Sequence, residues 1–278
     1  MIELGQYNVM TVARETDHGV FLIKDGNIDE AVLLPGKTRT EDLNVDDEVR
    51  VFIYTDSEDR IIATRETPKA VVGEFASLLV VDTNEYGAFL DWGLMKDLFV
   101  PFKQQPWPLE VGHRVVVHVL YDEVSDRIIA TAKLHSFFFP VEDALQIGDE
   151  VEAIIYDQTD TAYDCVASQR FKATIYKEAQ TKQYKTGDVA RLFVIKMGDR
   201  LVLSERKGGF EETMDEKYVF LERLEDAGGF LPYNSKTPSD IIQKELGLSK
   251  KLFKKIIGML YKDRIITIED NGIRIVEK

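Results

Sequence analysis

The sequence contains one cysteine, Cys165, so no intrachain disulfide can form, which fits a reducing compartment. No apolar run approaches the roughly 18 residues that a membrane-spanning helix needs. Residues 1–17 show no basic leader followed by an apolar block, the pattern typical of an export signal. These absences predict a cytoplasmic protein that does not associate with a membrane.

Positive charge is also scarce, because 35 Lys and Arg face 49 Asp and Glu, a net charge of −14. Binding of phosphate by charge alone requires a basic surface, so this balance argues against a purely electrostatic nucleic-acid binder. The imbalance is uneven, since residues 235–278 hold ten basic against six acidic residues and the remainder holds 25 against 43. An acidic body with a basic tail is compatible with binding through stacking and a local basic patch. It also fits a protein that never contacts nucleic acid.

Motifs of catalysis are missing. The sequence has no phosphate-binding loop ending in Gly-Lys-Ser/Thr, no Gly-x-Ser-x-Gly and no His-Glu-x-x-His. Its four histidines are scattered, and one cysteine cannot build a thiolate zinc site. We therefore expect a non-enzymatic protein with no metal and no cofactor, and an enzyme is the least favoured class.

An internal repeat organises the chain. His18–Leu22 matches Tyr86–Leu90 at an offset of 68 residues, and the identical hexapeptide DRIIAT recurs at Asp59 and Asp126, an offset of 67. Near-constant offsets in separate segments are the signature of tandem domains. A third, degraded copy begins near Gly148 and lacks the glycine and phenylalanine of the second strand. Five short strands bounded by Gly, Asp, Asn and Pro in each copy predict small β-barrels.

Beyond residue 207 the hydrophobic period changes from two to about 3.6, which indicates helices. Three helices are expected, the third with Ser249 as its N-cap, followed by a hairpin that turns at Asp270-Asn271-Gly272. This order describes a winged helix. The predicted domains are residues 1–67, 68–135, 140–207 and 210–278.

Aromatic residues interrupt the strand pattern of the second repeat. A flat ring outside a barrel can stack on a base, which contributes roughly 1–3 kcal/mol per base without requiring a particular sequence. The candidates are Tyr86, Phe89, Trp92 and Phe99, with His18 and Phe21 in the first repeat. The alternative is that these rings fill the barrel core or pack between adjacent barrels. In a regular strand Tyr86 and Phe89 would point to opposite faces, so a bulge or bend at Gly87 would be needed to bring them together.

Tyr86-Gly87-Ala88-Phe89-Leu90 and DRIIAT resemble S1-type RNA-binding repeats of the OB-fold class. Three such repeats followed by a winged helix resemble the bacterial conserved virulence factor B family of RNA-binding regulators. The resemblance implies RNA contacts from residues at matching positions of each repeat. These are His18, Phe21, Asp56 and Arg60 in the first, Tyr86, Phe89, Asp122 and Arg127 in the second, and Tyr163, Tyr176 and Arg200 in the third. The histidine usual on the third strand appears as Leu34 and Val100, and Asp164 replaces the second aromatic of the third repeat.

Lysines surround the third predicted helix, where they could contact a phosphate backbone. They are Lys250, Lys251, Lys254, Lys255 and Lys262. A solvated helix face is the plainer interpretation of such a row.

The favoured interpretation is a monomeric post-transcriptional regulator with three OB-type barrels and a winged helix, binding single-stranded RNA. Duplex nucleic acid stays open as a ligand of the winged helix. Two alternatives are a DNA-binding regulator in which the barrels contact protein, and an adapter for the ribosome or polymerase.

Overall fold

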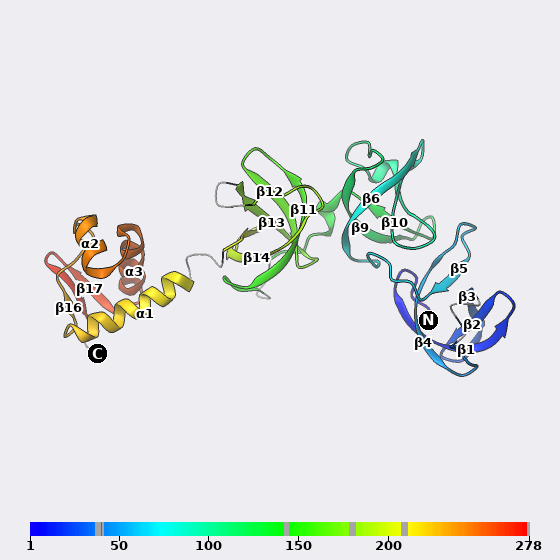
Figure 1. The fold of residues 1–278 in the computed structure, drawn as a ribbon, viewed down its shortest axis with the longest axis horizontal. Helices are drawn as coiled ribbons and strands as arrows, with labels where there is room; N and C mark the ends of the chain where they lie inside the picture. Colours follow the sequence, from blue (N-terminus) through cyan, green and yellow to red (C-terminus); the bar gives the residue numbers. More distant parts are fainter. Residues whose placement is uncertain (37–39, 41, 142–144, 178–181, 207–210, 277–278) are drawn as a thin grey trace.

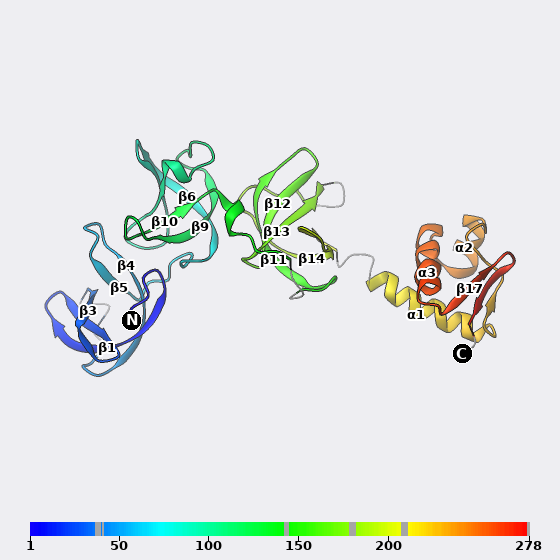
Figure 2. The same ribbon diagram turned by 180° about the vertical axis from the view of Figure 1, so that it is seen from behind.

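In the computed structural model the described residues are 1–36, 40, 42–141, 145–177, 182–206 and 211–276, with the backbone alone for 211–216 and 218. Three β-barrels and a helical C-terminal unit follow one another in chain order, as both Figure 1 and the reverse view in Figure 2 show. The predicted fold class, mainly β with three five-stranded barrels and a winged helix, is confirmed. The limits proposed for the four domains stay predictions.

The first repeat is a closed barrel with the strand order β1-β2-β3-β5-β4. Its strands are β1 (Tyr7–Thr16), β2 (Gly19–Lys24), β3 (Asn27–Pro35), β4 (Glu48–Thr55) and β5 (Ile61–Thr64). The third repeat closes in the corresponding order, β11-β12-β13-β15-β14. Its strands are β11 (Glu150–Gln158), β12 (Ala162–Ala167), β13 (Phe171–Tyr176), β14 (Val189–Lys196) and β15 (Leu201–Ser204).

The second repeat is a five-stranded sheet in the order β10-β9-β6-β7-β8. Its strands are β6 (Phe75–Asn84), β7 (Gly87–Leu90), β8 (Leu98–Pro101), β9 (Arg114–Asp122) and β10 (Arg127–Thr131). Strand β6 continues through residues 82–84, and β7 covers only the four residues Gly87–Leu90. Tyr86 and Trp92 therefore lie just outside β7, one at each end.

Strand β4 is buried on both faces, which explains how the first two repeats pack. Val51 and Ile53 point into the core of their own barrel, whereas Phe52 and Tyr54 join the core of the second repeat. Trp92 packs edge-on against Phe52, with ring centroids 5.5 Å apart and planes at 87°. Edge-to-face aromatic pairs add about 0.5–1.5 kcal/mol to the burial of their area. One strand thus serves two adjacent cores.

Strand β9 repeats this arrangement between the second and third repeats. Val117 faces the core of its own barrel, while Val116 joins Phe75 and residues of the third repeat in a separate apolar cluster. The side chain of Gln169 also accepts from the backbone N–H of Phe75 at 2.6 Å and donates to its carbonyl at 2.9 Å. A buried cluster with a paired amide fixes these two barrels against each other.

His118 lies in that second junction and should make it sensitive to acid. Its ring stacks on Phe137 at 4.1 Å, and Nε2 lies 3.2 Å from the carbonyl of Gly73. Nδ1 is buried without a hydrogen-bond partner among the described residues. Burial lowers the pKa of His118, so the folded state favours the neutral ring. Because the unfolded chain then binds more protons, we expect stability to fall as pH drops below the ordinary histidine value of about 6.5.

Thermal unfolding at pH 7.5 and 5.5 measures this effect. In the His118→Phe variant the loss of stability between the two pH values should shrink, whereas His18→Gln, at an exposed histidine, should behave like the wild type. An equal loss in all three proteins would contradict the assignment.

The C-terminal unit has helices α1 (Glu211–Asp226), α2 (Ser239–Leu246) and α3 (Lys250–Lys262), with strands β16 (Phe230–Leu231), β17 (Ile266–Glu269) and β18 (Gly272–Ile275). The Ser249 side chain accepts from the backbone N–H of Leu252 at 3.2 Å, so the predicted N-cap is confirmed. Phe253, Ile256 and Leu260 of α3 are fully buried. Within the described residues, no helix has the length and apolar character to cross a bilayer.

Candidate nucleic-acid interface

Four aromatic side chains of the second repeat line one groove: Tyr86, Phe89, Phe99 and the almost fully buried Trp92. Tyr86 is 69% exposed, and Phe89 and Phe99 are half-buried neighbours across β7 and β8, with ring centroids 5.1 Å apart. The groove has a volume of about 470 Å³ and is also lined by Lys96 and Arg127. A space of this size, with neighbouring rings tilted by 40° and two cations among its lining residues, matches the shape and chemistry of a nucleotide.

Tyr86 reaches the groove because it lies in a turn rather than in a strand. The Asn84 side-chain oxygen accepts from the backbone N–H groups of Tyr86 at 2.9 Å and Gly87 at 3.1 Å. Such an Asx turn removes Tyr86 from the period-two alternation of β7. A Cβ at Gly87 would lie 2.2 Å from the Val100 carbonyl oxygen and 2.7 Å from the Phe99 ring. Glycine therefore lets the Phe99 ring lie against the backbone beside Tyr86.

One wall of the groove comes from the first repeat. Asp59, in the turn between β4 and β5, accepts hydrogen bonds from Lys96 at 3.1 Å and from Arg127. Lys96 also donates to the carbonyl of Asp56 at 2.7 Å. The hydrogen bond from Lys96, with a further one from Arg127, lowers the pKa of Asp59, so this carboxylate stays charged at neutral pH. A carboxylate thus sits where the two cations would meet a phosphate.

The first repeat carries a smaller version of this face. His18 is exposed, and Phe21 is half-buried beneath the Arg14 guanidinium, 3.9 Å above the ring centroid. Leu33 stands opposite Phe21, where the second repeat has Phe99. Arg60 forms ion pairs with Asp56 at 2.7 Å and with Glu58 at 3.1 Å. Where the second repeat has the adjacent rings of Phe89 and Phe99, the first repeat has only Phe21, which is covered by Arg14.

The third repeat has a polar pair at the corresponding position. Asp164 and Thr174 are register partners, as Phe89 and Phe99 are, and the Thr174 hydroxyl donates to Asp164 at 3.0 Å. Arg200 lies 3.3 Å from the Thr174 oxygen and 3.9 Å from Asp164. Tyr176, a predicted contact of the third repeat, is 47% exposed and remains available to stack on a base. Stacking support is therefore weakest in the third repeat.

Two predicted contact residues are buried, which leaves little of either ring for a base to stack on. Trp92 is 3% exposed, and its indole N–H donates to the carbonyl of Ala70 at 2.7 Å. Trp92 lines the groove, but its ring packs in the junction between the repeats against Phe52 and Tyr54. Tyr163 is 4% exposed and packs at 90° against Tyr184, with ring centroids 5.5 Å apart. The strand alternation directs Tyr163 inward and leaves Asp164 on the outside.

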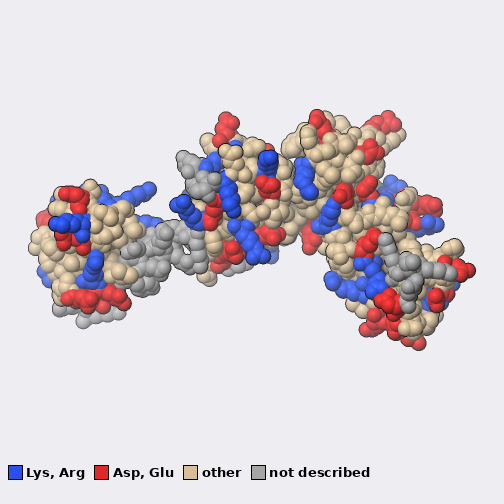
Figure 3. All heavy atoms as spheres, viewed as in Figure 1, with Lys and Arg blue, Asp and Glu red and all other residues tan. Residues whose placement is uncertain are grey.

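The lysines of α3 lie on its solvent side. Lys251, Lys254, Lys255 and Lys262 are exposed and Lys250 is half-exposed, while the apolar side of the helix is buried. In the described part of the chain no carboxylate forms an ion pair with Lys250, Lys251 or Lys254. On the face drawn in Figure 3, basic and acidic side chains are interspersed on all four units rather than gathered into areas of one sign.

Comparison with known proteins agrees with this architecture. The S1 domain model matches residues 4–66 and 72–133, and the model described as CvfB-like winged helix domain matches residues 219–275. Conserved virulence factor B of Staphylococcus epidermidis is 24% identical over 93% of this chain and 90% of its own length. The Staphylococcus aureus protein of that name is 25% identical over 93% of this chain and 89% of its own. The chain belongs to the conserved virulence factor B family.

A solved structure from Streptococcus pneumoniae, described as a multidomain protein with nucleic acid binding domains, is 26% identical and covers 98% of each chain, with a TM-score of 0.43. The S1 and winged-helix models place the chain among proteins built from nucleic-acid-binding domain types.

Two features of the described residues bear on metal binding and on thiol chemistry. They contain no group of three or more His, Cys, Asp or Glu placed to hold a metal ion. Cys165 is fully buried, and burial raises the pKa of its thiol, which suppresses the nucleophilic thiolate.

Several residues of the groove were not predicted from the sequence, among them Asn84, Lys96 and Asp59. Asn84 carried a usable signal, because an Asn two residues before a tyrosine and glycine is typical of an Asx turn. Asp59 carried none, since its role depends on how two barrels pack.

Proposed function

We propose that this protein binds single-stranded RNA through the groove of the second repeat, without catalysing a reaction, and acts as a post-transcriptional regulator in the cytoplasm. The observation that carries the proposal is the cluster of Tyr86, Phe89 and Phe99 beside Arg127. Bases can stack on the rings while the cations meet the adjoining phosphate. Flexible single strands can present unstacked bases to such rings, which a duplex cannot.

The first repeat has Phe21 and His18 at the corresponding positions of its own barrel, whereas the third repeat adds only Tyr176. Affinity should therefore be concentrated in the second repeat. Because base stacking rather than hydrogen bonding provides most of the contact, we expect weak sequence preference there.

Fluorescence anisotropy with labelled oligo-U, oligo-A and a duplex DNA of equal length tests the proposal. Micromolar or tighter binding of the single strands, with weaker binding of the duplex, is the expected result. Absence of single-strand binding at low salt would end the proposal. Preferential binding of the duplex would instead support the winged helix as the main contact.

The lysines of α3 support a second role for the winged helix, holding the backbone of the same RNA. When log K for a single strand is plotted against log salt concentration, each phosphate neutralised by a cation makes the slope steeper by about 0.7. The double variant Lys251→Gln, Lys254→Gln should therefore reduce this slope by roughly one unit or more. The control is Lys236→Gln, Lys244→Gln, at exposed lysines of the same unit that lie beside Asp270 and Glu245. An unchanged slope in the first variant would exclude α3 from the interface.

A further inference from the structure

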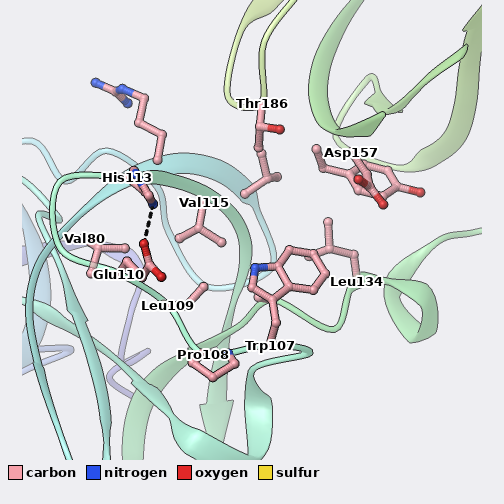
Figure 4. A pocket seen from close by; sticks show the side chains of 14 residues that line it. Val80, Trp107, Pro108, Leu109, Glu110, His113, Val115, Leu134, Asp157 and Thr186 are labelled. Atoms are coloured by element: carbon pink, nitrogen blue, oxygen red, sulfur yellow. Dashed lines mark ion pairs between the residues drawn. The ribbon is translucent and has the colours of Figure 1, made fainter. Parts of the chain in front are cut away.

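A second pocket, about 370 Å³ in volume, lies at the junction of the second and third repeats, away from the aromatic groove (Figure 4). Trp107 forms one side of it, with an apolar floor that includes Leu109, Val115 and Leu134. Asp157 and Thr186 of the third repeat complete it. We refer to this space as the Trp107 pocket.

The exposure of Trp107 is not explained by packing within the barrel. The side chain is 55% exposed, although a tryptophan normally buries most of its surface. It stands between Pro106 and Pro108, and two prolines restrict the backbone on either side of it. A ring held in place by a stiff backbone loses little conformational entropy when a ligand stacks on it.

The other walls are also held in place. Thr186 precedes Gly187, where a Cβ would lie 2.4 Å from the Ser77 hydroxyl of the second repeat, so the two barrels touch closely beside the pocket. The paired amide of Gln169 fixes the same junction. The pocket is therefore formed before any ligand arrives.

The polar groups of the pocket include Glu110 and His113, whose carboxylate and Nδ1 lie 3.5 Å apart (Figure 4), together with Arg114, Asp157 and Thr186. Arg114 donates to the Ser77 carbonyl at 3.0 Å and, among the described residues, has no carboxylate in an ion pair. By contrast, Arg60 and Arg127 each form an ion pair with an aspartate. A guanidinium with spare donors suits a phosphate, and the Asp157 carboxylate can accept from the amino group of a base.

We propose that the Trp107 pocket is a second base-binding site, in which one nucleotide of the RNA stacks on Trp107. Asp157 and Thr186 face the edge of the base, and Arg114 faces the phosphate. Since a carboxylate accepts but does not donate, the pocket prefers bases with an exocyclic amine, such as cytosine, over uracil. The ligand class rests on the proposed function, but the pocket can be tested on its own.

The chain contains two tryptophans, so 5-fluorotryptophan labelling gives two ¹⁹F NMR signals, which the Trp107→Phe variant assigns. In the full-length protein, titration with CMP should move the Trp107 signal, and UMP should bind about five-fold more weakly. The Asp157→Ala variant should lose this preference. A Trp107 signal that stays fixed with both nucleotides overturns the proposal, whether or not the aromatic groove binds RNA.

RNA binding gives the second measurement. Trp107→Ala should weaken binding of a long single strand by about five-fold or more, as expected for one lost stacking contact. Phe102→Ala is the matched control, because Phe102 is 59% exposed on the same repeat and lines neither pocket. If Phe89→Ala weakens binding and Trp107→Ala does not, the Trp107 pocket is excluded while the aromatic groove stands.

Discussion

Replacement of Phe89 by alanine should weaken binding of single-stranded RNA by about 5- to 150-fold, the equivalent of the roughly 1–3 kcal/mol that one stacked base contributes. The effect should be at the upper end, because the Phe89 ring also supports Phe99, 5.1 Å away. The measurement is fluorescence anisotropy with labelled oligo-U, at fixed salt.

The exposed Phe102 again provides the control, since Phe102→Ala removes a ring of the same kind outside the groove. Circular dichroism should show that both variants are folded. Equal affinities for the Phe89 and Phe102 variants would mean that the groove is not where RNA binds.

Replacement of Trp92 by alanine should have the largest effect on stability, lowering the free energy of unfolding by about 3–5 kcal/mol. The substitution opens a cavity beside Phe52 and Tyr54, whose rings pack edge-on against the indole, and leaves the carbonyl of Ala70 without its donor. Because these contacts join two barrels, the first repeat should also unfold at lower denaturant than in the wild type. Urea unfolding followed by circular dichroism measures both effects.

Trp107→Ala is the natural comparison, because it removes the same side chain from an exposed position. Surface substitutions usually change stability by no more than about 0.5 kcal/mol. A similar loss in the two variants would show that Trp92 is not the link between the barrels.

The repeated hexapeptide shows how far the sequence leads. Asp59-Arg60 and Asp126-Arg127 are identical pairs in two barrels; Arg127 begins β10, and Arg60 directly precedes β5. Their partners differ, since Arg60 pairs within its own turn while Arg127 reaches Asp59 of the preceding barrel. Periodicity gives the fold of each unit, but the side-chain pairing depends on the neighbour against which the unit packs.

The same reason explains the tryptophans. Trp92 follows a strand of the predicted aromatic surface and yet faces inward, because β4 of the first repeat presents Phe52 and Tyr54 to it. Residues 51–54 of β4 form an uninterrupted apolar run, so its sequence contained a sign of burial on both faces. The hydrophobic pattern of the sequence does not say which barrel covers the outer face of β4, the face that carries Phe52 and Tyr54.

Asp59 has a mechanical consequence for the joint between the first two barrels. An anion that takes over Lys96 and Arg127 must displace this carboxylate, and with it the contacts that tie the turn of one barrel to the other. Anion binding and separation of the two barrels are therefore linked equilibria. If binding of the anion weakens the contact between the barrels, then separating the barrels by another cause must raise the affinity for the anion by the same factor. The ion pairs of Asp59 with Lys96 and Arg127 therefore couple the packing of the first barrel on the second to the availability of both cations for an anion.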